Sequence, residues 1–89
     1  MNKFFSKRNY NEISDVIIEG LGGKDNISAF VHCVTRLHFS LKERNRVNAE
    51  VIDQCPGVYG SQWIGEEFQV IIGKPVDEIY DTIRRRFQI

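Results

Sequence analysis

The stretch ISAFVHCVTRLHFSL, residues 27–41, contains two runs of strand-forming residues joined by a short segment with a cysteine, a hydroxyl and a guanidinium. Residues 27–33 are mostly β-branched or aromatic, which is typical of a strand. Residues 36–41 alternate between apolar and polar, and their apolar members are Leu37, Phe39 and Leu41. We therefore predict a β-hairpin with its bend at or near residues 33–36 and one apolar face.

A second hairpin is predicted after residue 57. Its strands would be Val58 to Trp63 and Phe68 to Ile72, which flank the turn residues Ile64-Gly65-Glu66. The second of these runs again alternates, with Phe68, Val70 and Ile72 on one face. The chain thus supplies two hairpins that can share one apolar layer.

A helix is predicted before the first hairpin, from about residue 11 to residue 21. Apolar residues recur there at helical spacing, and Asn9 or Asn11 could cap the free amides. Gly22-Gly23 ends this helix, because glycine readily adopts the left-handed conformation of a helix stop. The surrounding GLGGKDN does not follow a strand and lacks the serine or threonine of a phosphate-binding P-loop.

Two more helices are predicted. A short one would be capped by Asn48 and stopped by Pro56. The last would begin near Pro75, with acidic residues in its first turn and the arginines 84–86 in its last turn. Those arginines would also suit the cytoplasmic flank of a following membrane segment. The apolar stripe of this helix comprises Val76, Ile79, Tyr80, Ile83 and Phe87.

The predicted order of elements is α-β-β-α-β-β-α, which indicates an α+β fold. We expect a four-stranded antiparallel sheet whose one face is covered by three helices, within a single domain at residues 1–89. The opposite face would carry Arg36, His38 and Gln69, so we expect it to face water or a partner.

Composition excludes several classes of function. Twelve basic and twelve acidic residues balance, so bulk charge gives no attraction for nucleic acid. No apolar run approaches the ~20 residues that span a bilayer, and the first ten residues do not resemble a signal peptide. We therefore expect a soluble, cytoplasmic domain in which Cys33 and Cys55 are free thiols. The cysteines and histidines lack metal-ligand spacing, so no metal site is predicted.

Cys33 is the candidate nucleophile. An ordinary thiol is only a few per cent thiolate at neutral pH, so a reactive cysteine needs a nearby cation or oriented amides. The bend would supply the backbone amides of Val34 and its neighbours, the hydroxyl of Thr35 and the guanidinium of Arg36. Such a cradle suits a thiolate and then a phosphoryl group on sulfur. On these residues alone, a lone cysteine at a strand end is more often a small buried hydrophobe.

The two histidines are predicted to differ. A strand neighbour points to the opposite face, so His32 cannot easily reach the sulfur of Cys33. His38 shares a face with Arg36 and could donate to a phosphate, titrate near neutrality, or simply be solvated. Cys55 lies just before a proline among apolar residues and is predicted to pack.

With these residues in view, the chain resembles the enzyme IIB domain of the phosphoenolpyruvate-dependent sugar phosphotransferase system, glucose/sucrose/β-glucoside superfamily. The resemblance covers LGGKDNI, CVTRLHFSLKE, VNAEVIDQCPGVYG, EEFQVIIG and the last helix. CVTRLHF matches the family's Cys-x-Thr-Arg-Leu-Arg-Phe signature, except that His38 replaces the second arginine. The resemblance implies a phosphotransferase with Cys33 as nucleophile, phosphate binding by Val34, Thr35, Arg36 and His38, and no cofactor or metal.

The resemblance also implies partners. Cys33 would accept a phosphoryl group from a phosphohistidine of enzyme IIA and pass it to a sugar held by the membrane enzyme IIC domain. The chain would then be the N-terminal part of a longer permease at the cytoplasmic face of the membrane. Histidine cannot form the bidentate contact of arginine and is charged only part of the time, so His38 would slow onward transfer, make it pH-dependent or indicate a different partner. The same difference favours the alternative of a regulatory module whose phosphorylated Cys33 controls docking. A redox domain is disfavoured because the chain has no C-x-x-C pair.

Overall fold

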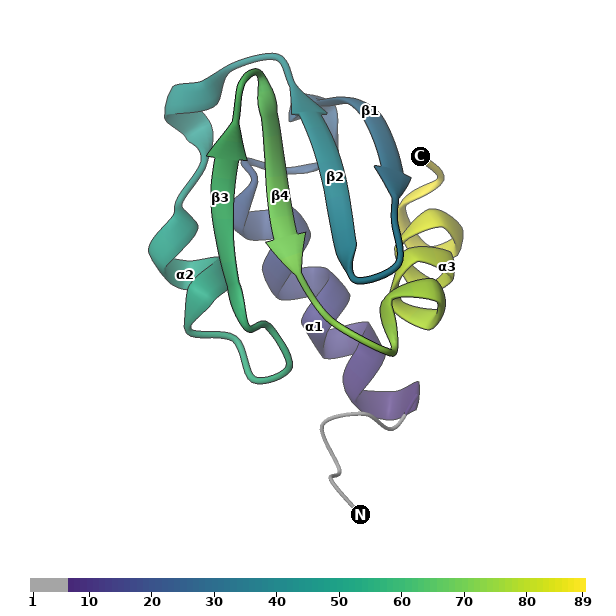
Figure 1. Cartoon of the computed structure of the whole chain (residues 1–89). Coiled ribbons are helices and arrows are strands. Elements are labelled where there is room, and N and C mark those ends of the chain that lie inside the picture. The colour runs from purple at the N-terminus through teal and green to yellow at the C-terminus, as the bar shows by residue number, and fades with distance from the viewer. Residues whose placement is uncertain (1–6) are drawn as a thin grey trace.

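Three α-helices and four β-strands alternate along residues 7–89, the part of the chain that this computed structural model describes (Figure 1). The helices are α1 (Lys7–Gly20), α2 (Ala49–Asp53) and α3 (Val76–Phe87). The strands are β1 (Ile27–His32), β2 (Arg36–Leu41), β3 (Gly60–Ile64) and β4 (Glu67–Ile71). The order α-β-β-α-β-β-α and the α+β class are those predicted.

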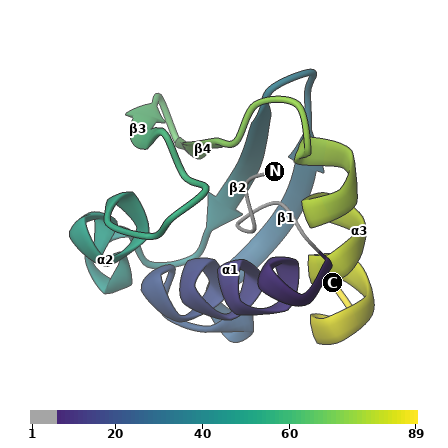
Figure 2. The same ribbon diagram turned by 90° about the horizontal axis from the view of Figure 1, so that it is seen from below.

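The strands form one antiparallel sheet in the order β1-β2-β4-β3, so β2 and β4 are the central pair. Leu37 pairs with Val70 and Phe39 with Phe68, which places the apolar members of both strands on the same face. Viewed from below, the helices gather on that side of the curved sheet (Figure 2). The alternation read from the sequence therefore sets which face is covered.

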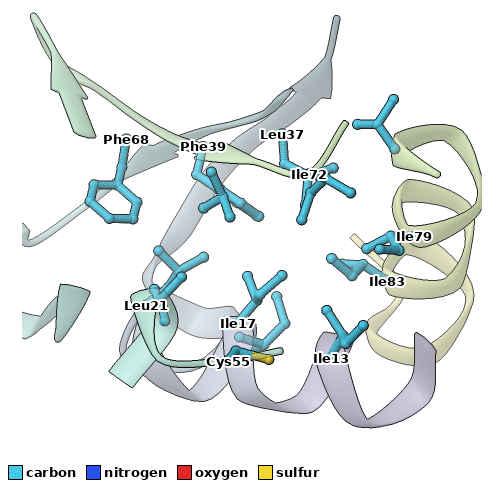
Figure 3. Packing of buried hydrophobic residues seen from close by; sticks show 14 of the residues in the cluster. Ile13, Ile17, Leu21, Leu37, Phe39, Cys55, Phe68, Ile72, Ile79 and Ile83 are labelled. Atoms are coloured by element: carbon cyan, nitrogen blue, oxygen red, sulfur yellow. The ribbon is translucent and has the colours of Figure 1, made fainter. Parts of the chain in front are cut away.

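The core lies between this face and the helices. Side chains from the sheet meet isoleucines of α1 and α3 there (Figure 3). Phe39 has no exposed surface, and its ring stacks on that of Phe30 with centroids 4.7 Å apart. Cys55 is buried in the same cluster, so its predicted packing role is confirmed.

The first helix is longer than predicted, because α1 already includes Lys7. Asn9 and Asn11 consequently lie inside the helix, so their predicted role as N-caps is wrong. The predicted stop is confirmed: Gly22 and Gly23 both have φ near +95° and donate backbone hydrogen bonds of 3.0 and 2.9 Å to the last turn. Within residues 7–89 no helix is both long and apolar enough to cross a bilayer.

The bounds of β1, β3 and β4 differ from the predicted ones by one or two residues, and those of β2 are as predicted. Asn48 caps α2 by accepting a hydrogen bond from the amide of Val51, as its position predicted. Pro75 is the N-cap of α3 and not a first-turn residue. The second hairpin turns at Gly65, whose φ of +60° favours glycine. The predicted strand through residue 33 ends at His32, which leaves Cys33 in the bend.

Candidate active site at the bend between β1 and β2

The bend between β1 and β2 lies at the same end of the sheet as the end of β4 (Figure 1). The amide of Cys33 donates to the carbonyl of Arg36 at 2.9 Å and closes the bend. The amides of Ile72 and Gly73 both donate to the carbonyl of Thr35, each at 2.9 Å. The bend is therefore held from within and from the segment after β4. The side chains at its tip, including that of Cys33, remain exposed.

The thiol of Cys33 lies among hydrogen-bond donors. Its pKa is lowered to about 7, and the largest cause is the hydrogen bond to the side chain of His38. The backbone amides of Thr35 and Arg36 also lower this pKa, because they donate to the thiolate. An exposed sulfur above two converging amides is an anion site that favours the deprotonated, nucleophilic form of Cys33.

His38 links this thiol to a carboxylate on the neighbouring strand. Its Nδ1 lies 2.8 Å from Oε1 of Glu67. Burial acts to lower the pKa of His38, but the hydrogen bonds to Cys33 and Glu67 outweigh it and raise the pKa. Among the described residues, Nε2 of His38 is the one buried side-chain nitrogen or oxygen that makes no hydrogen bond within the usual limits of distance and angle. With Nδ1 engaged by Glu67, Nε2 is the ring nitrogen left to interact with the thiol of Cys33.

The side chain of Arg36 is held away from the sulfur by a polar chain on the open face of the sheet. Its Nη1 donates to Oε1 of Gln69 at 3.0 Å, and Nε2 of Gln69 donates to Oε1 of Glu67 at 2.8 Å. Arg36 was predicted to be the cation beside Cys33, whereas in the structure the side chain of His38 acts on the thiol and Arg36 contributes its backbone amide. The open face thus carries a connected polar network.

His32 lies on the other side of the strand, as alternation predicted. Its Nδ1 is 2.9 Å from the carbonyl oxygen of Cys33 and 3.5 Å from Oδ1 of Asp77. Its ring packs against Tyr80, with centroids 4.4 Å apart. These contacts give His32 a place beside the backbone of the bend and not beside the sulfur.

A shallow pocket of about 500 Å³ opens next to the bend. It brings together residues of the bend, the segment after β4 and the start of α3, namely His32, Cys33, Val34, Thr35, Lys74, Val76 and Asp77. Sequence reasoning did not select Lys74, which adds a cation to the rim. Within residues 7–89 no group of three or more His, Cys, Asp or Glu side chains could hold a metal ion.

The lowered pKa of Cys33 makes its alkylation a direct probe of the site. We expect the rate with iodoacetamide to rise with pH and to reach half its maximum near pH 7, because the thiolate is the reacting form. The measurement uses a Cys55→Ala variant, so that only Cys33 reports. A midpoint at the ordinary value of about 8.5 would contradict the described donor set.

Comparisons with known proteins identify the family of this chain. The profile of the family described as phosphotransferase system, EIIB matches residues 16–48, which include the whole bend. The chain is 38% identical over 76 residues to the PTS system beta-glucoside-specific EIIBCA component of Bacillus subtilis, covering 85% of this chain and 12% of that protein. It is 42% identical over 71 residues to the trehalose-specific EIIBC component of the same organism, covering 79% and 15%.

A solved structure has the same fold as this chain. It is described as the crystal structure of one domain of the PTS system, IIabc component from Clostridium difficile. The TM-score is 0.83 at 28% identity, with 90% of this chain and 84% of that chain covered. The chain spans only about an eighth to a sixth of the curated relatives, so the likeness concerns one domain. The chain belongs to the EIIB family of the phosphotransferase system.

Proposed function

We propose that the protein is a phosphoryl carrier in sugar uptake, and that Cys33 holds the phosphoryl group as phosphocysteine. The donor is a phosphohistidine of an enzyme IIA domain, and the acceptor is a sugar held by a membrane enzyme IIC domain. The observation that carries the proposal is the convergence of the Thr35 and Arg36 amides and of His38 on the exposed sulfur of Cys33. Curated relatives named as sugar-specific EIIBC and EIIBCA components support the choice of partners.

The transfer balances as two displacements at phosphorus. The Cys33 thiolate attacks, the S–P bond forms and the P–N bond of the donor breaks. Its electron pair goes to the donor imidazole, which leaves neutral because its other nitrogen carries a proton. On delivery, a sugar hydroxyl attacks, its proton passes to water and the P–S pair returns to sulfur. Catalysis then consists of positioning and of stabilising charge on the phosphoryl oxygens.

The site has parts suited to those oxygens. The amides of the bend donate where negative charge gathers, the hydroxyl of Thr35 adds a donor, and His38 adds a titratable cation. Val34 contributes through the backbone of the tip, and its side chain is 85% exposed. The side chain of Val34 is therefore accessible to a partner domain that approaches the bend.

A transfer and chase experiment tests the carrier. The A part of the Bacillus subtilis β-glucoside relative, labelled with radioactive phosphate on its histidine, is mixed with this protein. We expect one phosphate per chain to move to this protein and then to leave it when membranes with a cognate enzyme IIC and sugar are added. No transfer from this or any other enzyme IIA of the superfamily would contradict the proposal. Label that moves but is never chased to sugar would favour a regulatory module.

We propose further that the chain is the EIIB domain of a sugar permease and works at the cytoplasmic face of the membrane. The relatives that it matches are multidomain components, of which this chain corresponds to 12–16%. Expression of the natural gene with a C-terminal tag, followed by membrane fractionation, tests this arrangement. Recovery of the tagged product at the size of this chain alone and outside the membranes would contradict it.

A further inference from the structure

The open face of the sheet holds a chain of polar contacts that begins at the sulfur of Cys33 and does not stop at His38. Glu67 accepts from two side chains through the same oxygen: Oε1 is 2.8 Å from Nδ1 of His38 and 2.8 Å from Nε2 of Gln69. Gln69 is only 7% exposed and is itself held by Arg36. The carboxylate is thus held by Gln69 as well as by His38.

This arrangement determines which nitrogen of His38 faces the thiol. A carboxylate accepts a hydrogen bond only from a protonated nitrogen, so Nδ1 carries a proton in both the neutral and the charged ring. Nε2 is then the atom that changes its protonation state. Among the described residues it is buried without a hydrogen bond of normal geometry, and it is the nitrogen left for the interaction of the ring with Cys33. A buried Nε2 without a hydrogen bond is explained if this nitrogen receives the proton of the thiol.

We propose that Glu67 is a positioning residue that orients His38 so that Nε2 takes the proton of Cys33 and keeps it while the sulfur carries the phosphoryl group. This role rests on the proposed carrier function. The S–H bond breaks, the proton moves to Nε2, and the electron pair stays on sulfur to form the S–P bond. His38 remains an imidazolium through both displacements. Sulfur therefore attacks and leaves as a thiolate beside the same positive charge.

Because His38 stands where the signature has an arginine, this proposal predicts a dependence on pH. Arginine cannot release a proton at any pH of interest, so it could stabilise the phosphoryl group but could not store the thiol proton. Two ionisable groups act on His38, namely Cys33 in the bend and Glu67 on β4, while Arg36 on β2 itself is hydrogen-bonded to Gln69. The facing residue of β1 is the uncharged Val31. Transfer should therefore depend on pH through the coupled Cys33–His38 pair.

The pH dependence has a defined sign. Hydrogen bonding lowers the pKa of Cys33 to about 7 and raises the pKa of His38, and both changes favour a pH window in which the thiolate and the imidazolium coexist. Below this window the sulfur is protonated, and above it His38 loses its charge. A bell-shaped rate of phosphoryl acceptance follows.

Substitution of Glu67 by glutamine tests the positioning role. In a Cys55→Ala background, Glu67→Gln should move the pH midpoint of Cys33 alkylation up by about one unit, which lowers the rate at pH 7 roughly fivefold. Glu66→Gln is the matched control, because Glu66 is exposed in the adjacent turn, and its midpoint should stay at the parent value. Circular dichroism establishes that each variant is folded. A folded Glu67→Gln variant with the parent midpoint would overturn the proposal.

Two further measurements separate orientation from mere stability. In a His38→Arg background the cation no longer titrates, so Glu67→Gln should shift the midpoint by less than about 0.3 units; a full shift there would contradict action through His38. In the unsubstituted protein, nitrogen-15 NMR at high pH should show neutral His38 with its proton on Nδ1. A proton on Nε2 would overturn the proposal even if the Glu67 variants do not fold.

These measurements use no phosphodonor, so they distinguish the two proposals. If the midpoint shifts as expected but no enzyme IIA transfers phosphate, the carrier function fails and the orientation of His38 by Glu67 stands. If transfer occurs with the same bell-shaped pH profile in the Glu67→Gln and parent proteins, the carrier stands and the positioning role fails.

Discussion

Replacement of Cys33 by serine is expected to lower phosphoryl acceptance by at least about 1,000-fold. The bend stabilises negative charge on the atom at this position and lowers the pKa of the thiol to about 7. A serine hydroxyl ionises so much less readily that the same donors leave it protonated at neutral pH. The measurement is the initial rate of label transfer from a phosphorylated enzyme IIA domain.

Cys55→Ala provides the matched control for this variant. Cys55 is the other free cysteine among the described residues, and it is buried in the core near α1. Burial raises the pKa of its thiol, so it is a poor nucleophile. Transfer to Cys55→Ala should match the parent within about twofold. Near-normal transfer to Cys33→Ser would mean that another residue accepts the phosphoryl group.

Truncation of Phe39 to alanine is expected to cause the largest loss of stability, about 3–5 kcal/mol. Phe39 lies at the centre of the sheet, has no exposed surface and stacks on Phe30. A chain of this length has a free energy of unfolding of only about 4–13 kcal/mol. The variant should therefore be close to unfolding at room temperature. Urea denaturation followed by circular dichroism measures the loss.

Val34→Ala is the control for this prediction. Val34 is also apolar, but its side chain is exposed at the tip of the bend. Its truncation should change the free energy of unfolding by less than about 0.5 kcal/mol. Equal losses for Val34→Ala and Phe39→Ala would show that the core does not lie where the structure places it.

The fold could be predicted from the sequence because the patterns that specify its strands and helix ends are local. Strict alternation in residues 36–41 predicted β2 with its observed bounds, and the same pattern placed Phe68 and Val70 on the core face. Gly22-Gly23 and Asn48 gave a helix end and a helix start through their own backbone preferences. The start of α1 was placed wrongly, because tertiary packing continues the helix past the asparagines that could have capped it.

The candidate site could be predicted only in part, because some of its contacts join residues that are far apart in the sequence. The bend and Cys33 lie within a few residues of one another, so their proximity follows from the sequence. The contact between His38 and Glu67 joins residues 29 positions apart and depends on the register of β2 against β4. That register also determines that Arg36 reaches Gln69. No local pattern contains this information.

The central claim is that the phosphoryl group resides on the sulfur of Cys33. Peptide mapping by mass spectrometry tests it most directly, on protein phosphorylated by enzyme IIA and digested under conditions that preserve labile phosphate. We predict one phosphate, on the peptide that contains the bend, with the fragment ions placing it on Cys33. A phosphate on His38 or His32, or on a peptide that excludes the bend, would contradict the claim.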